Sequence, residues 1–222
     1  AIEAGKHVVV EKPLEVTEER CQEILERARA QGVQVGVIFQ SRFAPANQAV
    51  KQALQEGRFG RIVMGDAYVK WYRPQSYYDS GAWRGTWELD GGGALMNQAI
   101  HAVDMLLWLM GPVECVDAHA ACLAHQRIEV EDTLSALLKF SSGAVGVIQA
   151  TTSVYPGYPK RIEIHGDRGG VVLVDDAVVS WHENGDAAPA AKMLERYGPK
   201  GLSGAASDPM AISFENHQRQ LE

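Results

Sequence analysis

The stretch KHVVVEKPLEVTEERCQEILERARAQGVQVGVIFQ, residues 6–40, decides the fold class of the chain. Its apolar, β-branched run at 6–10 predicts a short buried strand, and the run at 33–39 predicts a second one. Between them, Thr17 is a typical helix N-cap followed by acidic residues, and Gly32 ends the helix. Strand, helix and strand in this order predict the βαβ unit of a parallel sheet.

The rest of the chain changes character along its length. Up to residue 112 it predicts a helix at 45–56, a strand at 62–71, a loop at 72–90 and an apolar helix at 91–110. Strand-like segments then follow one another without helices, which favours antiparallel pairing; they lie near 113–121, 133–140, 144–153, 160–165, 170–174 and 177–182. At the end we expect a mobile loop over 187–209 and the start of a helix at 213–222.

We therefore expect two units. Residues 1–40 have the pattern of the C-terminal part of an α/β domain, and residues 41–222 that of an α+β domain with a large sheet.

Composition limits the function classes. The formal net charge is −7 and no Lys/Arg-rich run occurs, so nucleic acid is not an expected partner. No apolar stretch reaches the roughly 18 residues of a membrane helix, and the first residues lack a signal-peptide layout. The three cysteines form no CxxC pair, which is typical of reduced thiols in a cytoplasmic protein; they are Cys21, Cys115 and Cys122.

Lys12 follows the first predicted strand directly, within Glu11-Lys12-Pro13. Ligands of open α/β sheets bind at the carboxyl ends of strands, and a lysine there can donate a proton or a hydrogen bond to a reacting oxygen. The alternative is an ordinary surface charge pair followed by a turn.

The segment GGGALMNQAIHAVDMLLWLMG, residues 91–111, places a polar stripe on an apolar helix. Asn97, His101, Asp104 and Trp108 are spaced to share one helix face. His101 is the natural proton carrier near neutral pH. Asn97 can orient a hydroxyl or the imidazole, and Asp104 can brace His101 from behind. The alternative is a satisfied core histidine.

The predicted loop at 72–90 is rich in aromatic and arginine side chains. Tyr77, Tyr78 and Arg84 suit a sugar face and a carboxylate or phosphate, although aromatic burial that merely anchors the loop explains them equally. No HxH, HExxH or Cys/His cluster predicts a metal site. The GxGxxG phosphate loop of a dinucleotide domain is also absent from these residues.

Three quoted segments resemble one family. AIEAGKHVVVEKPLEVT, VGVIFQSRFAPANQAVK and WRGTWELDGGGALMNQAIHAVDMLLWLMGPV are similar to the Gfo/Idh/MocA oxidoreductases, and the similarity extends to about Trp181. The resemblance implies an α+β fold: a remnant of a Rossmann-like parallel domain, then a large, mostly antiparallel open sheet covered by helices on one face. It also implies NAD or NADP as cofactor, hydride transfer at a carbinol of a sugar, cyclitol or nucleotide sugar, and a homodimer or homotetramer formed through the sheet.

The resemblance also implies site residues. Lys12 and His101 would be catalytic, and Asn97, where many members have aspartate, would orient the substrate. Cofactor binding would fall to Glu11, Lys12, Pro13 and Gln40; substrate binding would fall to Arg84, Tyr77, Tyr78, Asn97 and His101. The sequence around residues 83–98 is similar to that of the family branch acting on nucleotide-linked amino sugars and their uronic acids.

Both ends depart from the family pattern, because the first Rossmann strands with their glycine loop are absent and the final helix after Phe214 is truncated. We therefore expect a fragment of a longer protein that binds dinucleotide poorly alone. The rival expectation is a non-catalytic sugar-binding or oligomerisation module.

Overall fold

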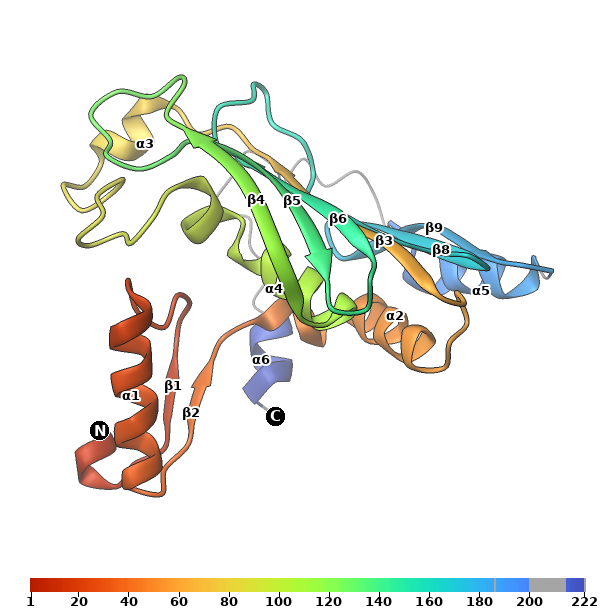
Figure 1. Cartoon of the computed structure of the whole chain (residues 1–222), viewed down its shortest axis with the longest axis horizontal. Coiled ribbons are helices and arrows are strands. Elements are labelled where there is room, and N and C mark those ends of the chain that lie inside the picture. The colour runs from red at the N-terminus through yellow and green to blue at the C-terminus, as the bar shows by residue number, and fades with distance from the viewer. Residues whose placement is uncertain (186, 200–214, 222) are drawn as a thin grey trace.

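The computed structural model describes residues 1–185, 187–199 and 215–221. The N-terminal part contains a short 3-10 turn η1 (Ile2–Ala4), strand β1 (Val8–Val10), helix α1 (Glu18–Ala30) and strand β2 (Val35–Val37). β1 and β2 pair in parallel, with Val9 opposite Gly36. Thr17 caps α1, its hydroxyl accepting from the Arg20 amide at 3.3 Å. The predicted strand–helix–strand unit is confirmed, and it forms a separate arm in Figure 1.

The larger part is built on a seven-stranded sheet with the order β4-β5-β6-β3-β7-β8-β9. The strands are β3 (Ile62–Lys70), β4 (Val113–Ala121), β5 (Thr133–Phe140), β6 (Val145–Thr151), β7 (Arg161–Gly166), β8 (Gly169–Val174) and β9 (Ala177–Glu183). β3 lies in the centre, parallel to β6 and antiparallel to β7. All other neighbours are antiparallel, so the prediction of a mostly antiparallel sheet is confirmed.

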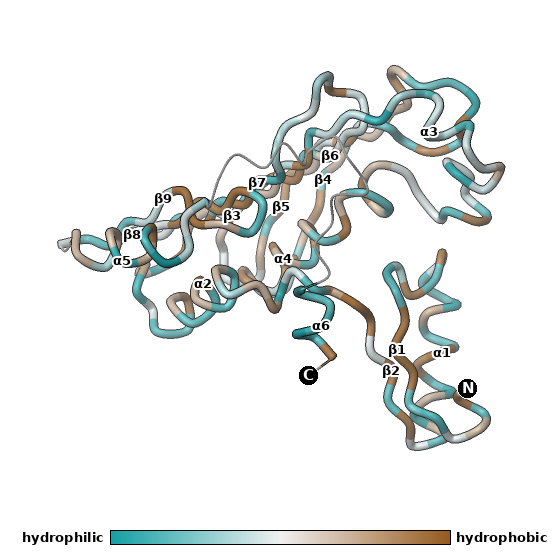
Figure 2. Tube along the Cα trace, turned by 180° about the vertical axis from the view of Figure 1, so that it is seen from behind, coloured by the Kyte–Doolittle hydropathy of each residue, from teal (hydrophilic) through white to brown (hydrophobic). Residues whose placement is uncertain are grey.

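Helices cover one face of this sheet. The 3-10 turn η2 (Gln40–Phe43) leads into α2 (Pro45–Gln55), and α2, α4 (Ile100–Met110) and α5 (Ala188–Tyr197) lie on the same side in Figures 1 and 2. Alternate strand residues point to this side and form the core with Met105 of α4. The largest fully buried side chains include Trp181, Phe59 and Phe140.

The opposite face of the sheet is open. Register places Leu137 opposite Val147, and Lys139 opposite Val145. Leu137, Val145 and Met64 are 61%, 47% and 42% exposed, which is unusual for large apolar side chains clustered on adjacent strands. This outer face therefore has an apolar centre without a covering layer among the described residues.

Two sequence predictions about helices were wrong. The segment after residue 187, expected to be a loop, begins with α5, because its Ala-rich composition favours helix and Met193 and Tyr197 pack on the core. The helix expected over 91–110 is interrupted: Ala94–Gln98 form a π turn, η3, and α4 starts only at Ile100. The carboxylate of Glu131 accepts from the Gly93 and Leu95 amides and caps this turn.

The remaining segments agree with expectation or lie outside the described residues. The loop at 72–90 contains one short helix, α3 (Gln75–Asp79), and the C-terminal helix α6 covers Glu215–Leu221. The expected loop residues 200–209 fall outside the described part of the chain. Over the part that is described, every helix is too short or too polar to cross a bilayer.

Candidate active site

Lys12 stands at the carboxyl end of β1 and reaches the larger part of the molecule. Its Nζ donates to the backbone oxygen of Asn97 at 3.0 Å. Burial lowers the pKa of Lys12 below its usual value, and the nearby Glu11 and Asp90 carboxylates oppose part of that effect. Lys12 is thus a partly buried cation beside the π turn η3, at the strand end where the sequence predicts a ligand site.

His101 lies in the first turn of α4, next to Lys12. Its ring makes an edge contact with Phe39, with centroids 6.0 Å apart. Burial, then the positive charges of Lys12 and Lys160, lower the pKa of His101 to about 3. Its Nδ1 is buried and has no hydrogen-bond partner in the described structure. At neutral pH His101 is therefore a neutral imidazole with an unused ring nitrogen.

Asn97 is held on two sides. Its Nδ2 donates to Asp90 Oδ1, and its Oδ1 accepts from Gln98 Nε2 at 2.9 Å. These contacts fix which way the amide faces. The structure thus brings together Lys12, Asn97 and His101, the three residues predicted to be catalytic.

Asp104 does not brace His101, so this prediction was wrong. Its two oxygens accept from Arg42 Nη2 at 2.5 Å and Nε at 2.8 Å. The π turn shifts Asn97 relative to α4, and the Asp104 side of the helix faces η2 instead. Trp108, one turn further on, accepts a hydrogen bond at its carbonyl from Lys51 Nζ at 2.5 Å.

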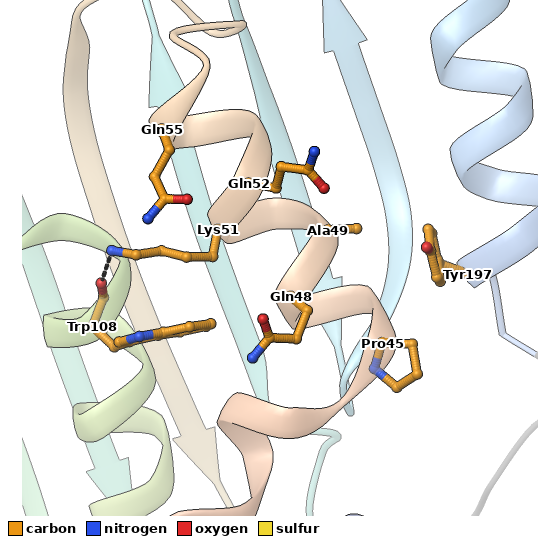
Figure 3. A pocket seen from close by; sticks show the side chains of 8 residues that line it. All are labelled: Pro45, Gln48, Ala49, Lys51, Gln52, Gln55, Trp108 and Tyr197. Carbon is orange, nitrogen blue, oxygen red and sulfur yellow. Dashed lines mark hydrogen bonds between the residues drawn. The ribbon is translucent and has the colours of Figure 1, made fainter. Parts of the chain in front are cut away.

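Trp108 belongs to a separate surface groove between α2, α4 and α5. Figure 3 shows Lys51 stretched across it above the Trp108 ring. The lining residues include neither Lys12, Asn97 nor His101: they are Pro45, Gln48, Ala49, Lys51, Gln52, Gln55, Trp108 and Tyr197. This groove is therefore not the candidate active site.

The three candidate residues of the aromatic loop, residues 72–90, lie in different surroundings. Tyr77 accepts a hydrogen bond at its hydroxyl from Gln98 Nε2 at 3.0 Å, which ties it to the Asn97 turn. The Arg84 guanidinium stacks on Tyr77 at 4.3 Å and on Trp83 at 4.4 Å. Tyr78 points inward: its hydroxyl lies 2.8 Å from Thr152 Oγ1, and burial raises its pKa to about 12.

The residues expected to bind cofactor border the strand ends. Glu11 is exposed and lies 3.8 Å from His217 of α6, while Pro13 is half-buried behind Lys12. Gln40 opens η2 just after β2, and its Oε1 is buried without a partner in the described residues.

Sequence reasoning missed Asp90 and Gln98, which bond Asn97 directly. Arg73, one of the arginines expected in the aromatic loop, donates to Gln98 Oε1 at 3.2 and 3.1 Å. Lys160 is buried against Asp176 at 2.8 Å on the other side of His101. The only sequence signal for Asp90 is its position directly before the glycine triplet.

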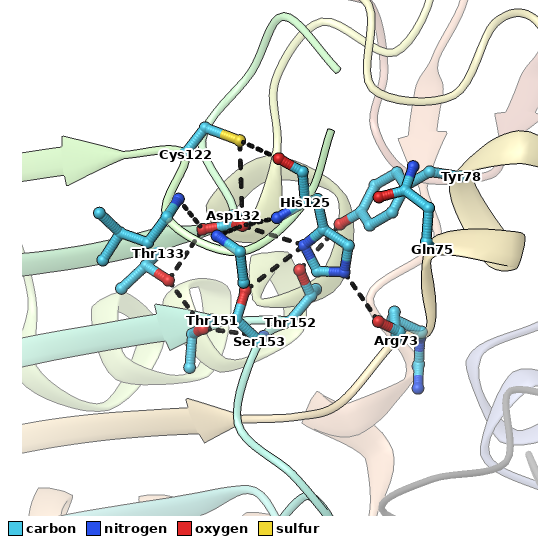
Figure 4. Close-up of polar contacts among 12 residues, drawn as sticks. Arg73, Gln75, Tyr78, Cys122, His125, Asp132, Thr133, Thr151, Thr152 and Ser153 are labelled. Carbon is cyan, nitrogen blue, oxygen red and sulfur yellow. Dashed lines mark hydrogen bonds and ion pairs between the residues drawn. The ribbon is translucent and has the colours of Figure 1, made fainter. Parts of the chain in front are cut away.

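A second polar network supports the aromatic loop from behind (Figure 4). His125 Nδ1 lies 2.9 Å from Asp132, and its Nε2 lies 2.8 Å from the Arg73 carbonyl. Burial would raise the pKa of Asp132, but backbone amides, including those of Leu123 and Ala124, and the His125 ring lower it overall. This network anchors residues 122–132 to the start of the loop.

The geometry fits a nicotinamide dinucleotide at the end of the parallel strands. Gln40 Oε1 and His101 Nδ1 are buried polar atoms without partners in the described structure, and both border the carboxyl edge of the β1–β2 pair. An amide-bearing ring and a hydroxyl are groups that could satisfy them. Within the described ranges, no cluster of three or more His, Cys, Asp or Glu residues could hold a metal ion.

The chain thus combines a parallel strand unit that ends in a partly buried lysine with an open sheet whose helix α4 places a histidine beside that lysine, an arrangement that fits a nicotinamide-dependent oxidoreductase. Residues 1–39 match the family model described as "Oxidoreductase family, NAD-binding Rossmann fold", and residues 47–172 match the "GFO/IDH/MocA C-terminal domain". The chain belongs to the Gfo/Idh/MocA family of oxidoreductases.

Individual relatives agree with this assignment. The WlbA dehydrogenase from Bordetella pertussis, solved with NADH and UDP-GlcNAcA, is 42% identical with a TM-score of 0.82, over 87% of this chain and 57% of that one. The levoglucosan dehydrogenase of Pseudarthrobacter phenanthrenivorans is 30% identical over 78% of this chain and 50% of its own length. Inositol 2-dehydrogenase of Rhizobium meliloti is 31% identical, over 80% and 52%. The chain thus spans about half the length of these curated relatives.

The depressed pKa of His101 predicts a pH dependence of stability. The pKa is about 3 in the fold and 6.5 as the ordinary value, so the unfolded chain binds more protons between these limits. This stability is complete above pH 6.5 and is lost as the pH falls. From pH 6.5 to pH 5 the free energy of unfolding should fall by about 2 kcal/mol from this group alone.

Denaturant unfolding of the wild type and of His101→Gln at both pH values measures this term. The variant should lose less stability on acidification by that amount. Equal losses in the two proteins would show that His101 is not held neutral by the fold.

Proposed function

We propose that the full-length protein is an NAD-dependent dehydrogenase that oxidises a hydroxyl group of a nucleotide-linked sugar acid. The observation that carries this proposal is the meeting of Lys12 and neutral His101 beside Asn97, at the carboxyl end of β1. We also propose that the chain divides at residue 40, with the cofactor-binding domain in residues 1–40 and the substrate-binding and oligomerisation domain in residues 41–222.

The chain's own residues account for the proton chemistry. His101, neutral at pH 7, accepts the hydroxyl proton of the substrate, while the Lys12 Nζ donates a hydrogen bond to the same oxygen as negative charge develops there. Asn97 orients that hydroxyl, because its amide is already fixed. NAD bound over the strand ends would supply the hydride acceptor for the carbinol C–H, and a carbonyl forms.

We propose that Gln40 and Pro13 line the cofactor side. Gln40 presents a buried amide oxygen without a partner in the described chain, which suits a carboxamide N–H donor. Glu11 is exposed at the rim, where it can meet a ribose hydroxyl.

The substrate class rests on Arg84 and Tyr77. Arg84 makes no ion pair with the described residues and is held on two aromatic faces, so its N–H fork is available to a carboxylate. The 42% identity to a dehydrogenase solved with UDP-GlcNAcA supports the same class. Tyr78, whose hydroxyl is bound to Thr152, would act by packing behind Tyr77 rather than by touching the sugar.

We further propose that a second copy of the chain covers the outer face of the sheet, giving a homodimer or a homotetramer. The exposed apolar centre formed by Leu137, Val145 and Met64 supports this. The three cysteines are free, which supports a reducing, cytoplasmic location.

The catalytic assignment predicts large losses of turnover. In the full-length protein, Lys12→Met and His101→Gln should each lower kcat by at least about 100-fold, the usual scale for acid–base groups. Steady-state kinetics with UDP-GlcNAcA and NAD measures this, with NADH binding as the control for folding. Wild-type protein that binds NADH but turns over no sugar nucleotide would favour a non-catalytic module instead.

The substrate assignment predicts a selective effect at Arg84. Arg84→Gln should raise KM for UDP-GlcNAcA by roughly 10-fold or more, because a charge-assisted hydrogen bond is lost. The neutral sugar UDP-GlcNAc lacks the carboxylate, so any residual activity on it should change little. An equal change for both substrates would place Arg84 elsewhere, for example on the phosphates.

The assembly proposal predicts that a charge at the centre of the outer face weakens association. Leu137→Glu should reduce the molar mass seen by light scattering at micromolar concentration. Leu123→Glu, on an exposed leucine outside the sheet, is the matched control. A full-sized oligomer in Leu137→Glu would place the interface on another surface.

A further inference from the structure

Asp90 is a buried carboxylate that has no role in the proposed proton transfer. It is 8% exposed and ends the aromatic loop directly before the glycine triplet. Its Oδ2 accepts from the Gly85 amide at 2.8 Å, and its Oδ1 accepts from Asn97 Nδ2. Because both oxygens accept from N–H groups, the surroundings fit the charged carboxylate and leave no acceptor for a carboxyl proton.

Asp90 is connected to Lys12 through a single residue, Asn97, which forms a hydrogen bond with each of them. Asn97 gives its side-chain N–H to Asp90, and its backbone oxygen receives the Lys12 Nζ at 3.0 Å. The Asn97 Oδ1 is occupied by Gln98 Nε2, so the amide cannot flip without losing both bonds. The position of Asn97 between substrate and lysine therefore depends on Asp90.

The charge of Lys12 needs a counterpart. A partly buried ammonium is unfavourable unless negative charge lies near it. Lys12 makes no direct ion pair with any residue in the described ranges, and three titratable groups surround it: Glu11, Asp90 and His101. His101 is neutral. Of the two carboxylates Glu11 raises the pKa of Lys12 more than Asp90 does, but its side chain is 68% exposed, so water and salt screen its charge. Asp90 is the one buried carboxylate of the three.

We propose that Asp90 is a positioning residue of the active site: its carboxylate fixes the Asn97 amide and supplies the negative charge that offsets the Lys12 ammonium. The inference rests on the proposed dehydrogenase function, because it assigns the effect of Asp90 to the lysine at the reacting oxygen. Asp90 itself does not touch the substrate.

The contacts allow an exchange of the two side chains. In Asp90→Asn combined with Asn97→Asp, the new amide at 90 can accept from the Gly85 N–H and donate to the new carboxylate at 97. That carboxylate can still accept from Gln98 Nε2. The double variant therefore keeps each hydrogen bond and moves the charge by one side chain. Asp90→Asn alone removes the charge and leaves one oxygen for two donors. The new side-chain N–H must then face the N–H of either Gly85 or Asn97.

The test follows the titration of Lys12 itself. Lysine labelled with ¹³C at Cε reports protonation by NMR, and Lys12→Arg identifies the Lys12 signal. Four full-length proteins are compared: wild type, Asp90→Asn, the exchanged double variant, and Glu88→Gln as a control that removes an exposed carboxylate from the same loop. The pH profile of kcat is recorded on the same samples.

We expect the Lys12 midpoint to fall in Asp90→Asn, because the ammonium loses one nearby opposite charge. The Lys12-dependent limb of the kcat profile should move the same way. The exchanged variant should return the Lys12 midpoint to the wild-type value or above it, because its carboxylate at position 97 belongs to the residue that Lys12 contacts. Glu88→Gln should change neither the midpoint nor the kcat profile. An unchanged midpoint in Asp90→Asn, or no recovery in the exchanged variant, would overturn the proposal.

The test also covers a variant that does not fold and a wild type that is inactive. If Asp90→Asn fails to fold, the exchanged variant decides alone, since a folded protein whose Lys12 midpoint is at or above the wild-type value supports the proposal and a lower midpoint contradicts it. If the wild type shows no dehydrogenase turnover, the proposed function fails, while the NMR titration still tests the role of Asp90.

Discussion

The hydrogen bond from Lys12 Nζ to the Asn97 carbonyl is the contact on which the site depends. It joins the end of the small parallel sheet to the π turn that precedes α4, across 85 residues of sequence. Lys12 contributes the charge and Asn97 the fixed acceptor. Because the two residues come from different parts of the fold, the site forms only when those parts are held together.

The fold was largely predictable because its signals are local. Alternating apolar residues marked β5 and β6, and Thr17 with its acidic neighbours marked α1. The break before α4 was not predictable, because it depends on Glu131, a residue more than 30 positions away that caps the turn. α5 was missed because the Ala- and Pro-rich residues at its start have the composition of a loop, although Met193 and Tyr197 further on form an apolar side that packs on the core.

The sequence identified residues that the fold brings together better than it identified their contacts. Lys12, Asn97 and His101 lie close together, whereas the expected contact of Asp104 with His101 is absent because Arg42, from a different element, bonds both Asp104 oxygens. Asp90, Gln98 and Lys160 carry no motif, since their importance comes from neighbours brought close only by folding. Periodicity identifies faces of helices, whereas the partners across a face come from tertiary structure.

The central position of β3 has a consequence for folding while the protein is synthesised on the ribosome. β3 precedes the other six strands of its sheet in the sequence, yet its two neighbours are β6 and β7, with Met64 opposite Val145 and His165. Until those residues have been synthesised, the middle of the sheet has no edge to pair with. The nascent chain must therefore carry β3 without its sheet partners until β6 and β7 have been made, a period in which its apolar side chains are exposed to other chains and to chaperones.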